Sequence, residues 1–400
     1  MIERRANEFR LEKTLEDLGR LHKFVGCRRW VWNRALALQL ERLEQHQTLL
    51  TYVELAKHLT AWRHDPATEW LSEGPVHTQQ STLRDLERAF QRWRKGTSRR
   101  PRFKKKGRHE SIRYPDCKQI KFDFATRDPE GRAILPRIFL PQIGWVKFRM
   151  SRPLSGKVCN ATVGCKGGLW YVSIQTEMDI SPAPIPQTEE NTIGGDVGLC
   201  CFLKLSDGRS IEKPQHIQRI EERLCTAQRK LSRMKQGSKN HTAQKKRVQR
   251  IHRQAACARK DFLHKVSSDL SKNHAYVKLE KAQVQRMVKS PDTDLPGGSQ
   301  THAERARFNR RLLDVGWGMF LFLLDYKLRA RGGGLILVNP AYTSKECSCC
   351  GSIHKENRPT RDRFYCLACH HKEDADWNAA KVIKKREGPS RLACERPPQG

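Results

Sequence analysis

The spacing of apolar residues divides the first half of the chain into three stretches. Residues 1–14 alternate weakly between apolar and polar types and predict one strand. From about residue 15 to 95, apolar residues recur every three or four positions, which predicts helices. Residues 111–180 alternate again, with Gly167–Gly168 as a hairpin turn, and predict further strands. A small β-barrel that the first strand closes, with the helices as an insertion, would accommodate this order.

A proline-rich stretch at 181–191 predicts a linker between this half and the next. After it, the pattern predicts a strand, a turn at Asp207–Gly208, a returning strand and a helical hairpin from about 217 to 270. A short strand ending at Glu280, a loop over 285–303, a helix and a last strand follow. We expect these elements to share one sheet, with a final helix after it.

The charge of the chain favours a polyanionic partner. Lysine and arginine total 77 against 43 aspartate and glutamate, which gives a formal net charge of +34 and an isoelectric point near 10.0. Nucleic acid is the partner that such an excess favours, and an anionic membrane surface is the alternative. No apolar run is long enough to span a bilayer, and the charged N-terminal residues lack an apolar signal region. We therefore expect a protein that stays in the cytoplasm.

The most basic segment lies between Arg92 and Arg108. Ten of its residues are lysine or arginine and none is acidic. A flexible, solvated linker is one interpretation of such a run. Pro101 and Phe103 interrupt the charge, so we favour a strap that contacts phosphates. Its candidate nucleic-acid contacts are Arg99, Arg100, Arg102, Lys104, Lys105 and Lys106.

Two cysteine pairs near the end of the chain predict a metal site. The pairs are Cys347-x2-Cys350 and Cys366-x2-Cys369, with fifteen residues between them. Four thiolates from two such turns are typical of structural Zn²⁺, and a disulfide interpretation is disfavoured without a secretory sequence. The alternative ligands are Cys349 in place of Cys350, and the histidines His354, His370 and His371. The remaining cysteines we expect to be small core residues, namely Cys27, Cys117, Cys159, Cys165, Cys200, Cys201, Cys225, Cys257 and Cys394.

Three acidic residues are candidates for a second metal site. Asp196 interrupts an apolar strand, Glu280 ends another, and Asp376 stands at a helix start after the second cysteine pair. An isolated Asp-x-Asp is usually a solvated turn or a helix cap. If one sheet brings the three carboxylates together, they suit two Mg²⁺ ions that assist phosphodiester cleavage. Clustered carboxylates need such cations because like charges repel.

Several motifs resemble one protein family over nearly the whole chain. GGDVGL around Asp196, KLEKAQV around Glu280, YTSKECSCCG and CLACHHKEDADWNAA resemble the three RuvC-type motifs and the zinc ribbon of TnpB. Upstream, RWVWNRAL, LSEGPVHTQQSTLRDLERAFQRW and PRFKKKG are similar to its N-terminal signatures, and DVGWGMFLFLLDYKL is similar to its helix before the ribbon. TnpB, also called OrfB, is the protein of bacterial insertion sequences and is related to compact type V CRISPR effectors, so the resemblance implies a prokaryotic, nucleoid-associated protein.

The resemblance implies an RNA-guided endonuclease that cleaves double-stranded DNA next to a short adjacent motif by two-metal hydrolysis. Its partners would be a guide RNA from the transposon end and a DNA target, with one protein chain per RNA. The motif match implies catalytic, Mg²⁺-binding carboxylates at Asp196, Glu280 and Asp376, and one structural Zn²⁺ held by Cys347, Cys350, Cys366 and Cys369. Tyr52 and Gln80 match regions that contact the adjacent motif.

The implied fold is α+β and multidomain. A wedge β-barrel with an inserted helical recognition domain precedes an RNase H-like (RuvC) α/β nuclease domain with an inserted zinc ribbon. The expected boundaries are 1–14 and 96–180 for the wedge, 15–95 for the recognition domain, 181–191 for the linker, 192–342 and 373–386 for the nuclease domain, 343–372 for the ribbon and 387–400 for a disordered tail.

The chain departs from the family pattern at two positions that support the carboxylates. Gly195 replaces a branched apolar residue and Ala282 replaces a leucine, and both changes would loosen the strands without removing a ligand. Trp377 lies at a position where residue identity is looser. Two other functions fit the same composition. One is a nuclease-inactive, RNA-guided repressor, which the intact carboxylates disfavour, and the other is a transposase that cuts and joins DNA without RNA.

Overall fold

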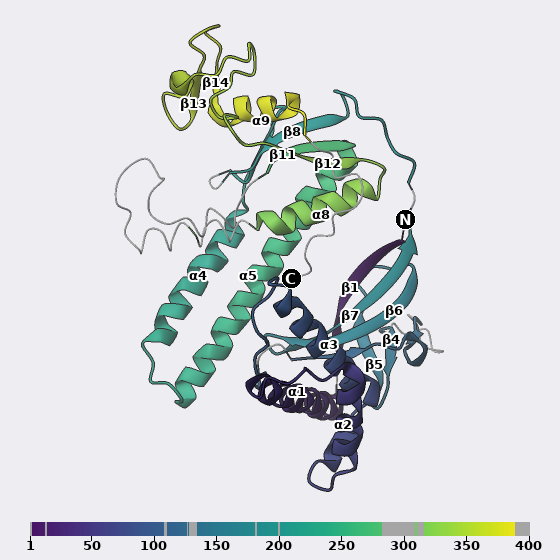
Figure 1. Cartoon of the computed structure of the whole chain (residues 1–400). Coiled ribbons are helices and arrows are strands. Elements are labelled where there is room, and N and C mark those ends of the chain that lie inside the picture. Colours follow the sequence, from purple (N-terminus) through teal and green to yellow (C-terminus); the bar gives the residue numbers. More distant parts are fainter. Residues whose placement is uncertain are drawn as a thin grey trace. The chain divides into compact units, whose positions relative to one another are not determined.

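The computed structural model describes residues 2–12, 14–107, 110–125, 127, 134–180, 182–198, 201–281, 309 and 316–388. The loop predicted over 285–303, the departure at Ala282 and all but the first two residues of the predicted tail lie outside these ranges. The chain divides into two units, Met1–Ile180 and Ser181–Gly400, which are described separately (Figure 1).

The first unit is built on a seven-stranded antiparallel sheet in the order β2-β6-β7-β1-β5-β4-β3. Its strands are β1 (Ile2–Glu12), β2 (Ser111–Tyr114), β3 (Lys121–Asp123), β4 (Arg137–Leu140), β5 (Gly144–Arg149), β6 (Lys157–Lys166) and β7 (Leu169–Asp179). Among the described residues no ladder joins β2 to β3, so the sheet is open where the sequence predicted a closed barrel. The first strand does not close the sheet, because β1 lies in its middle, paired with β7 along most of its length and with β5 at its end.

Alternation along these strands fills one face of the sheet with apolar side chains. Phe9 and Leu11 of β1 are buried, as are Trp170 and Val172 of β7, with more exposed residues between them. Gly167–Gly168 turns between β6 and β7 with φ values of 56° and 81°. Glycine adopts such positive φ values at little cost, so the predicted hairpin is confirmed.

Three helices lie between β1 and β2 in the chain: α1 (Leu15–Glu44), α2 (Tyr52–His64) and α3 (Val76–Arg94), with a short 3-10 helix over Glu69–Glu73. α1 and α2 each begin with a capping box, formed by Thr14 with Asp17 and by Thr51 with Glu54. Their apolar faces meet in one buried cluster that includes Leu36, Leu55, Leu83, Leu86 and Phe90. The helical character predicted for this part of the chain is confirmed.

The second unit contains a five-stranded sheet in the order β10-β9-β8-β11-β12. Its strands are β8 (Thr192–Asp196), β9 (Leu203–Leu205), β10 (Ser210–Ile211), β11 (Tyr276–Glu280) and β12 (Gly334–Val338). β9 pairs antiparallel with β8 and β10, whereas β11 runs parallel to β8 and β12. The described helices of this unit are α4 (Gln215–Ser232), α5 (Lys239–Asn273), α8 (Trp317–Arg329) and α9 (Ala375–Lys385).

The pleat of β8 and β11 sorts their residues between the two faces of the sheet. Ile193 and Leu279 belong to the main core, which α5 and α8 cover. Gly194 faces α9, because a Cβ at this position would lie 2.3 Å from the carbonyl oxygen of Ala380. Successive side chains of a strand point to opposite faces, so the ends of β8 and β11 present Asp196 and Glu280 on the face of α9.

Gly195 does not loosen β8 in the way that the sequence suggested. The position pairs with Leu205 on one side and with Leu279 on the other. A Cβ here would lie 2.8 Å from Leu203 Cδ1 and 3.0 Å from Leu279 Cδ2. These leucines fill the space that a branched side chain would take, and the strand keeps both neighbours.

The cysteine pairs lie in a small lobe between β12 and α9. The lobe contains β13 (Arg363–Tyr365), β14 (Lys372–Asp374) and a 3-10 helix over Lys355–Asn357, and β13 pairs antiparallel with β14. β14 leads directly into α9, and it ends at Asp374, two residues before Asp376.

The prediction that the scattered cysteines are core residues was wrong for most of those described. Cys27 is buried, Cys257 is exposed, and Cys117, Cys159, Cys165, Cys201 and Cys225 are half-buried. Cys257 lies two positions after the buried Ala255, which places it on the opposite side of α5. Cys200 and Cys394 lie outside the described residues. None of the helices in the described ranges has the length and apolar character needed to cross a membrane.

Candidate functional site

Three elements bring the predicted carboxylates to one place. Asp196 ends β8, and Glu280 ends the neighbouring parallel strand β11. Asp376 lies in the first turn of α9, which packs against β8. The charges of Glu280 and Asp376 both act on Asp196, so each of these two groups lies within electrostatic reach of Asp196.

Asp196 is repelled by the other two carboxylates in a largely buried setting. The pKa of Asp196 is raised from 3.8 to about 7, first by burial and then by the negative charges of Glu280 and Asp376. Burial also raises the pKa of Glu280, and a short hydrogen bond from Thr343 Oγ1 to Glu280 Oε1 opposes that rise. Carboxylates whose ionised forms are disfavoured in this way gain from a nearby cation. Carboxylate oxygens suit a hard divalent metal ion. In the described structure, however, the one group of donor atoms close enough together to hold an ion is the four cysteine thiols, so the carboxylates are not drawn together to coordination distance.

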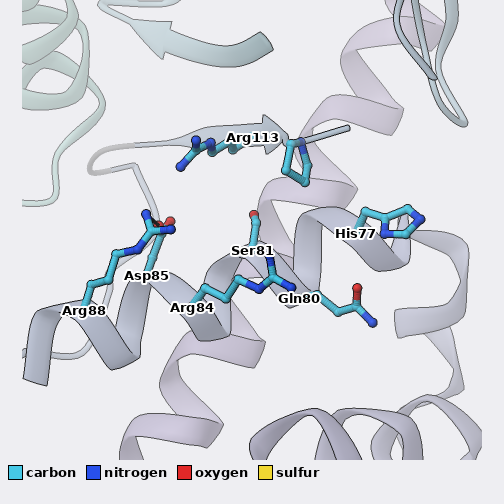
Figure 2. A pocket seen from close by; sticks show the side chains of 8 residues that line it. His77, Gln80, Ser81, Arg84, Asp85, Arg88 and Arg113 are labelled. Carbon is cyan, nitrogen blue, oxygen red and sulfur yellow. Dashed lines mark ion pairs between the residues drawn. The ribbon is translucent and has the colours of Figure 1, made fainter. Parts of the chain in front are cut away.

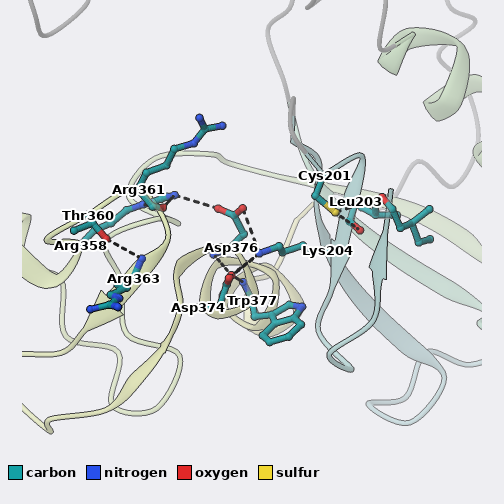
Figure 3. Close-up of polar contacts among 11 residues, drawn as sticks. Cys201, Leu203, Lys204, Arg358, Thr360, Arg361, Arg363, Asp374, Asp376 and Trp377 are labelled. Atoms are coloured by element: carbon teal, nitrogen blue, oxygen red, sulfur yellow. Dashed lines mark hydrogen bonds and ion pairs between the residues drawn. The ribbon is translucent and has the colours of Figure 1, made fainter. Parts of the chain in front are cut away.

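Two basic side chains that the sequence analysis did not single out lie beside Asp376 (Figure 3). Arg358 donates to Asp376 Oδ1 at 3.1 Å, and Lys204 Nζ lies 3.7 Å from Asp376 Oδ2. Lys204 belongs to β9 and Arg358 to the cysteine lobe. The sequence could not identify Lys204 and Arg358, because they are two of 77 lysines and arginines. Their contact with Asp376 joins distant segments and so leaves no local sequence pattern.

The four predicted cysteine ligands form one group. The Sγ atoms of Cys347, Cys350, Cys366 and Cys369 lie within 4.8 Å of one another. Cys347 Sγ is 3.6 Å from Cys369 Sγ, and Cys350 Sγ is 3.5 Å from Cys366 Sγ. A group of four thiols at such distances can hold a metal ion such as Zn²⁺.

The alternative ligands lie outside this group in the described structure. Cys349 is exposed, and its backbone N–H points to Cys347 Sγ at 3.4 Å. The three histidines have other polar neighbours: His354 lies near Glu356, His370 contacts the Tyr365 hydroxyl, and His371 contacts Glu373.

Hydrogen bonds tie the cysteine lobe to the carboxylates. Thr343, four residues before the first cysteine, donates to Glu280, and Arg358 donates to Asp376. The buried Asn378 of α9 accepts from Ser348 N at 2.9 Å and donates to Glu346 O at 2.7 Å. The first cysteine turn is thereby attached to the helix that carries Asp376.

A polar hollow of about 280 Å³ lies along α3 (Figure 2). Its lining residues are His77, Gln80, Ser81, Arg84, Asp85, Arg88, Arg113 and Pro115. The guanidinium carbon of Arg84 lies 4.6 Å from the centre of the Tyr52 ring. Arg84 therefore lines the same hollow as Gln80 and also contacts Tyr52 of α2.

The basic strap is attached to α1 through its backbone. Trp32 Nε1 donates to Arg102 O at 3.0 Å, and the Asn33 amide exchanges two hydrogen bonds with the backbone of Lys104 at 3.1 and 2.8 Å. Lys104 Nζ lies 3.9 Å from the centre of the Trp32 ring, and burial lowers the pKa of Lys104 to about 8. The other predicted contacts are exposed, namely Arg99, Arg100, Arg102, Lys105 and Lys106.

Three family models match parts of the chain. Residues 173–291 match a family described as "Probable transposase", and residues 317–383 match one described as "Cas12f1-like, TNB domain". Residues 1–48, which form β1 and α1, match a "Helix-turn-helix domain".

Two curated relatives align with nearly the whole chain. "Putative RNA-guided DNA endonuclease InsQ" of Escherichia coli K12 is 36% identical over 97% of this chain and 93% of the relative. A "Putative RNA-guided DNA endonuclease" of Streptomyces pristinaespiralis is 29% identical over 95% of this chain and 88% of the relative.

Two solved structures share the mixed α/β fold. A chain in the Cas12f1-sgRNA-target DNA complex aligns with a TM-score of 0.51 at 13% identity, covering 92% of this chain and 82% of that one. The mini-RNA-guided endonuclease CRISPR-Cas_phi3 aligns with a TM-score of 0.50 at 10% identity, covering 97% of this chain and 94% of that one. At such identities the likeness concerns the fold alone.

Proposed function

The chain belongs to the TnpB (OrfB) family of DNA endonucleases, and we propose that it is an RNA-guided member that cleaves double-stranded DNA next to a short adjacent motif. Membership rests on the relative that is 36% identical over nearly the whole chain. The observation that carries the activity is the meeting of Asp196, Glu280 and Asp376 on one face of the sheet. A protein that only bound DNA would not need to keep three mutually repelling carboxylates.

We assign two Mg²⁺ ions to these carboxylates, because hard divalent cations prefer oxygen ligands and neutralise clustered negative charge. Asp196 and Glu280 would hold these ions through oxygens from adjacent strands, and Asp376 through its own oxygens from α9. The chemistry supplied there would be activation of an attacking water and stabilisation of the leaving oxygen of a phosphodiester. The hydrogen bond from Thr343 orients Glu280, as outer partners of metal ligands commonly do.

We assign one structural Zn²⁺ to the four cysteines. Four protein ligands complete a tetrahedral shell and leave no open position for a substrate or water. The contacts of Thr343, Arg358 and Asn378 connect this lobe to the carboxylates. The metal would therefore support catalysis by holding the lobe in shape.

The proposed partners are a guide RNA and a double-stranded DNA target. The exposed cations of the strap, from Arg99 to Lys106, would contact phosphates, since their backbone is held in place on α1. The hollow on α3, with Gln80 and the neighbouring Tyr52, would read the adjacent motif. The donors and acceptors of amide and arginine side chains suit base edges in a duplex groove.

The proposed domains follow from the same assignment. Residues 1–14 and 96–180 would form the wedge, and residues 15–95 the recognition domain. Residues 192–342 and 373–386 would form an RNase H-like nuclease domain with the ribbon, 343–372, inserted. The sheet of three antiparallel strands followed by two parallel ones supports the nuclease assignment.

The test is cleavage of a plasmid that carries both the adjacent motif and a match to the RNA that co-purifies with the protein. Asp196→Ala, Glu280→Gln and Asp376→Asn should each abolish cleavage in Mg²⁺ and leave RNA binding intact. The control is Asp261→Asn on α5, whose exposed side chain pairs with Lys265. An Asp196→Ala variant that cut at the wild-type rate would overturn the catalytic assignment.

A further inference from the structure

Lys204 lies beside Asp374 and Asp376 in a position that the motifs do not explain (Figure 3). In the antiparallel pairing of β8 and β9 it stands directly opposite Asp196. Its ammonium does not pair with Asp196. It lies 2.7 Å from both carboxylate oxygens of Asp374, 3.7 Å from Asp376 Oδ2 and 5.4 Å from the centre of the Trp377 ring. Its side chain is 18% exposed, so water screens these contacts less than on an open surface.

The partner of Lys204 is the N-cap of the helix that carries Asp376. Asp374 Oδ1 accepts from the backbone N–H of Asp376 at 3.0 Å and from that of Trp377 at 3.2 Å. An N-cap side chain of this kind determines where a helix begins. The same carboxylate therefore bonds the lysine from β9 and the first turn of α9.

We propose that Lys204 is a positioning residue for the nuclease reaction, acting through Asp374 to hold the first turn of α9, and with it Asp376, beside Asp196. The inference rests on the proposed nuclease function and adds to it a residue outside the three motifs. Lys204 acts on the protein and not on the DNA, because both oxygens of Asp374 already engage its ammonium.

Charge repulsion is the reason that such a clamp is needed. Asp374 and Asp376 lie one residue apart at the helix start, and Asp196 and Glu280 add two more acidic groups beside them. Arg358 pairs with Asp376 but with no oxygen of Asp374 among the described contacts. Without Lys204, Asp374 would lose the positive charge that balances it next to Asp376 and keep only the two backbone N–H groups, and the first turn of α9 would lose its attachment to β9.

The test is a double-substitution cycle in guided cleavage with the full-length protein and its RNA. Lys204→Met keeps the length of the side chain and removes the charge, whereas Asp374→Asn keeps a capping oxygen and removes the ion pair. We expect each single variant to slow cleavage roughly 10–100-fold, with unchanged target binding, because small displacements of a catalytic group have effects of that size. The double variant should lose no more than Lys204→Met alone, and Lys204→Arg should recover part of the rate.

The matched control is Lys213→Met. Lys213 also pairs with both oxygens of a carboxylate, at 2.9 and 2.7 Å from Glu221, and is 23% exposed. This control should cleave as the wild type does. Two results would overturn the proposal and assign Lys204 a direct contact with DNA. In the first, the double variant loses cleavage rate by the product of the two single-variant losses. In the second, Asp374→Asn cleaves at the wild-type rate.

A second readout does not depend on cleavage. Hydrogen exchange in Mg²⁺-free buffer should be faster at the backbone amides of Asp376 and Trp377 in Lys204→Met than in the wild type or Lys213→Met. Unchanged exchange at these amides would overturn the proposal even if cleavage fell. If the wild type cut no guided target, the proposed function would fail, whereas the exchange result would still decide whether the clamp exists.

Discussion

Replacing Asp196 by asparagine should stabilise the Mg²⁺-free protein while removing its nuclease activity. The folded chain raises the pKa of Asp196 from 3.8 to about 7 through burial and the charges of Glu280 and Asp376. The folded state therefore binds a proton on this group more tightly than the unfolded state does. The stabilisation that this protonated carboxyl gives the folded state is fully present below pH 3.8, and it is lost as the pH rises through about 7.

The size of the effect follows from that difference in pKa. A tenfold change in proton binding is worth about 1.4 kcal/mol. Ionisation of Asp196 should therefore lower the free energy of unfolding by at most about 4 kcal/mol near pH 8 and by about 1.5 kcal/mol near pH 5, compared with a side chain that stays neutral. Asparagine has the same shape as the protonated acid and does not ionise. The gain in unfolding free energy from Asp196→Asn should therefore be larger near pH 8 by about 2–3 kcal/mol.

The assay is denaturant unfolding of the second unit in full-length protein, in zinc-containing, Mg²⁺-free buffer at both pH values. Comparing the two pH values removes any effect of the substitution that does not depend on ionisation. Asp261→Asn, an exposed aspartate on α5 with a side chain 61% exposed, is the control and should show no such pH-dependent gain. A gain from Asp196→Asn that is absent, or equal at the two pH values, would refute the reasoning.

Three further outcomes are expected. Lys105→Ala with Lys106→Ala should weaken nucleic-acid binding and flatten its salt dependence by about two phosphate contacts, and an unchanged slope in a salt titration would contradict the strap assignment. Removing zinc with a chelator should raise protease sensitivity within the cysteine lobe and lower cleavage through the lost contacts of Thr343 and Arg358, and unchanged proteolysis would exclude a structural metal. Gly194→Ala should destabilise the second unit by roughly 1–3 kcal/mol, because its Cβ would lie 2.3 Å from the Ala380 carbonyl oxygen of α9, and a thermal melt with an unchanged midpoint would show that α9 is free to move.

The elements near the carboxylates were predictable because they are local. The turn at Asp207–Gly208 and the strand that ends at Glu280 follow from turn residues and apolar runs. The apolar run before that turn predicted one strand with Asp196 inside it, whereas the structure has β8, which ends at Asp196, and a separate strand β9 over Leu203–Leu205. The period of a strand also determines which of its residues share a face. Once β8 and β11 pair in parallel, Asp196 and Glu280 must lie on the same side as Gly194.

The remaining features depend on contacts between distant parts of the chain. The position of β1 in the middle of its sheet depends on pairing with a strand more than 150 residues later, which alternation alone does not specify. Lys204 and Arg358 reach Asp376 from separate segments and have no motif of their own. The exposure of Cys257 follows from its place around the helix and not from its residue type.

The central claim is that the carboxylates cut DNA under the direction of an RNA. The most direct measurement is to purify the protein with its RNA, sequence that RNA, exchange its DNA-matching segment and follow cleavage of two plasmids, one matching each segment. The account predicts one dominant RNA species and cleavage that moves to the second plasmid when the segment is exchanged, with none by Asp196→Asn. An absence of discrete RNA after low-salt purification, or cleavage that ignores the exchanged segment, would contradict it.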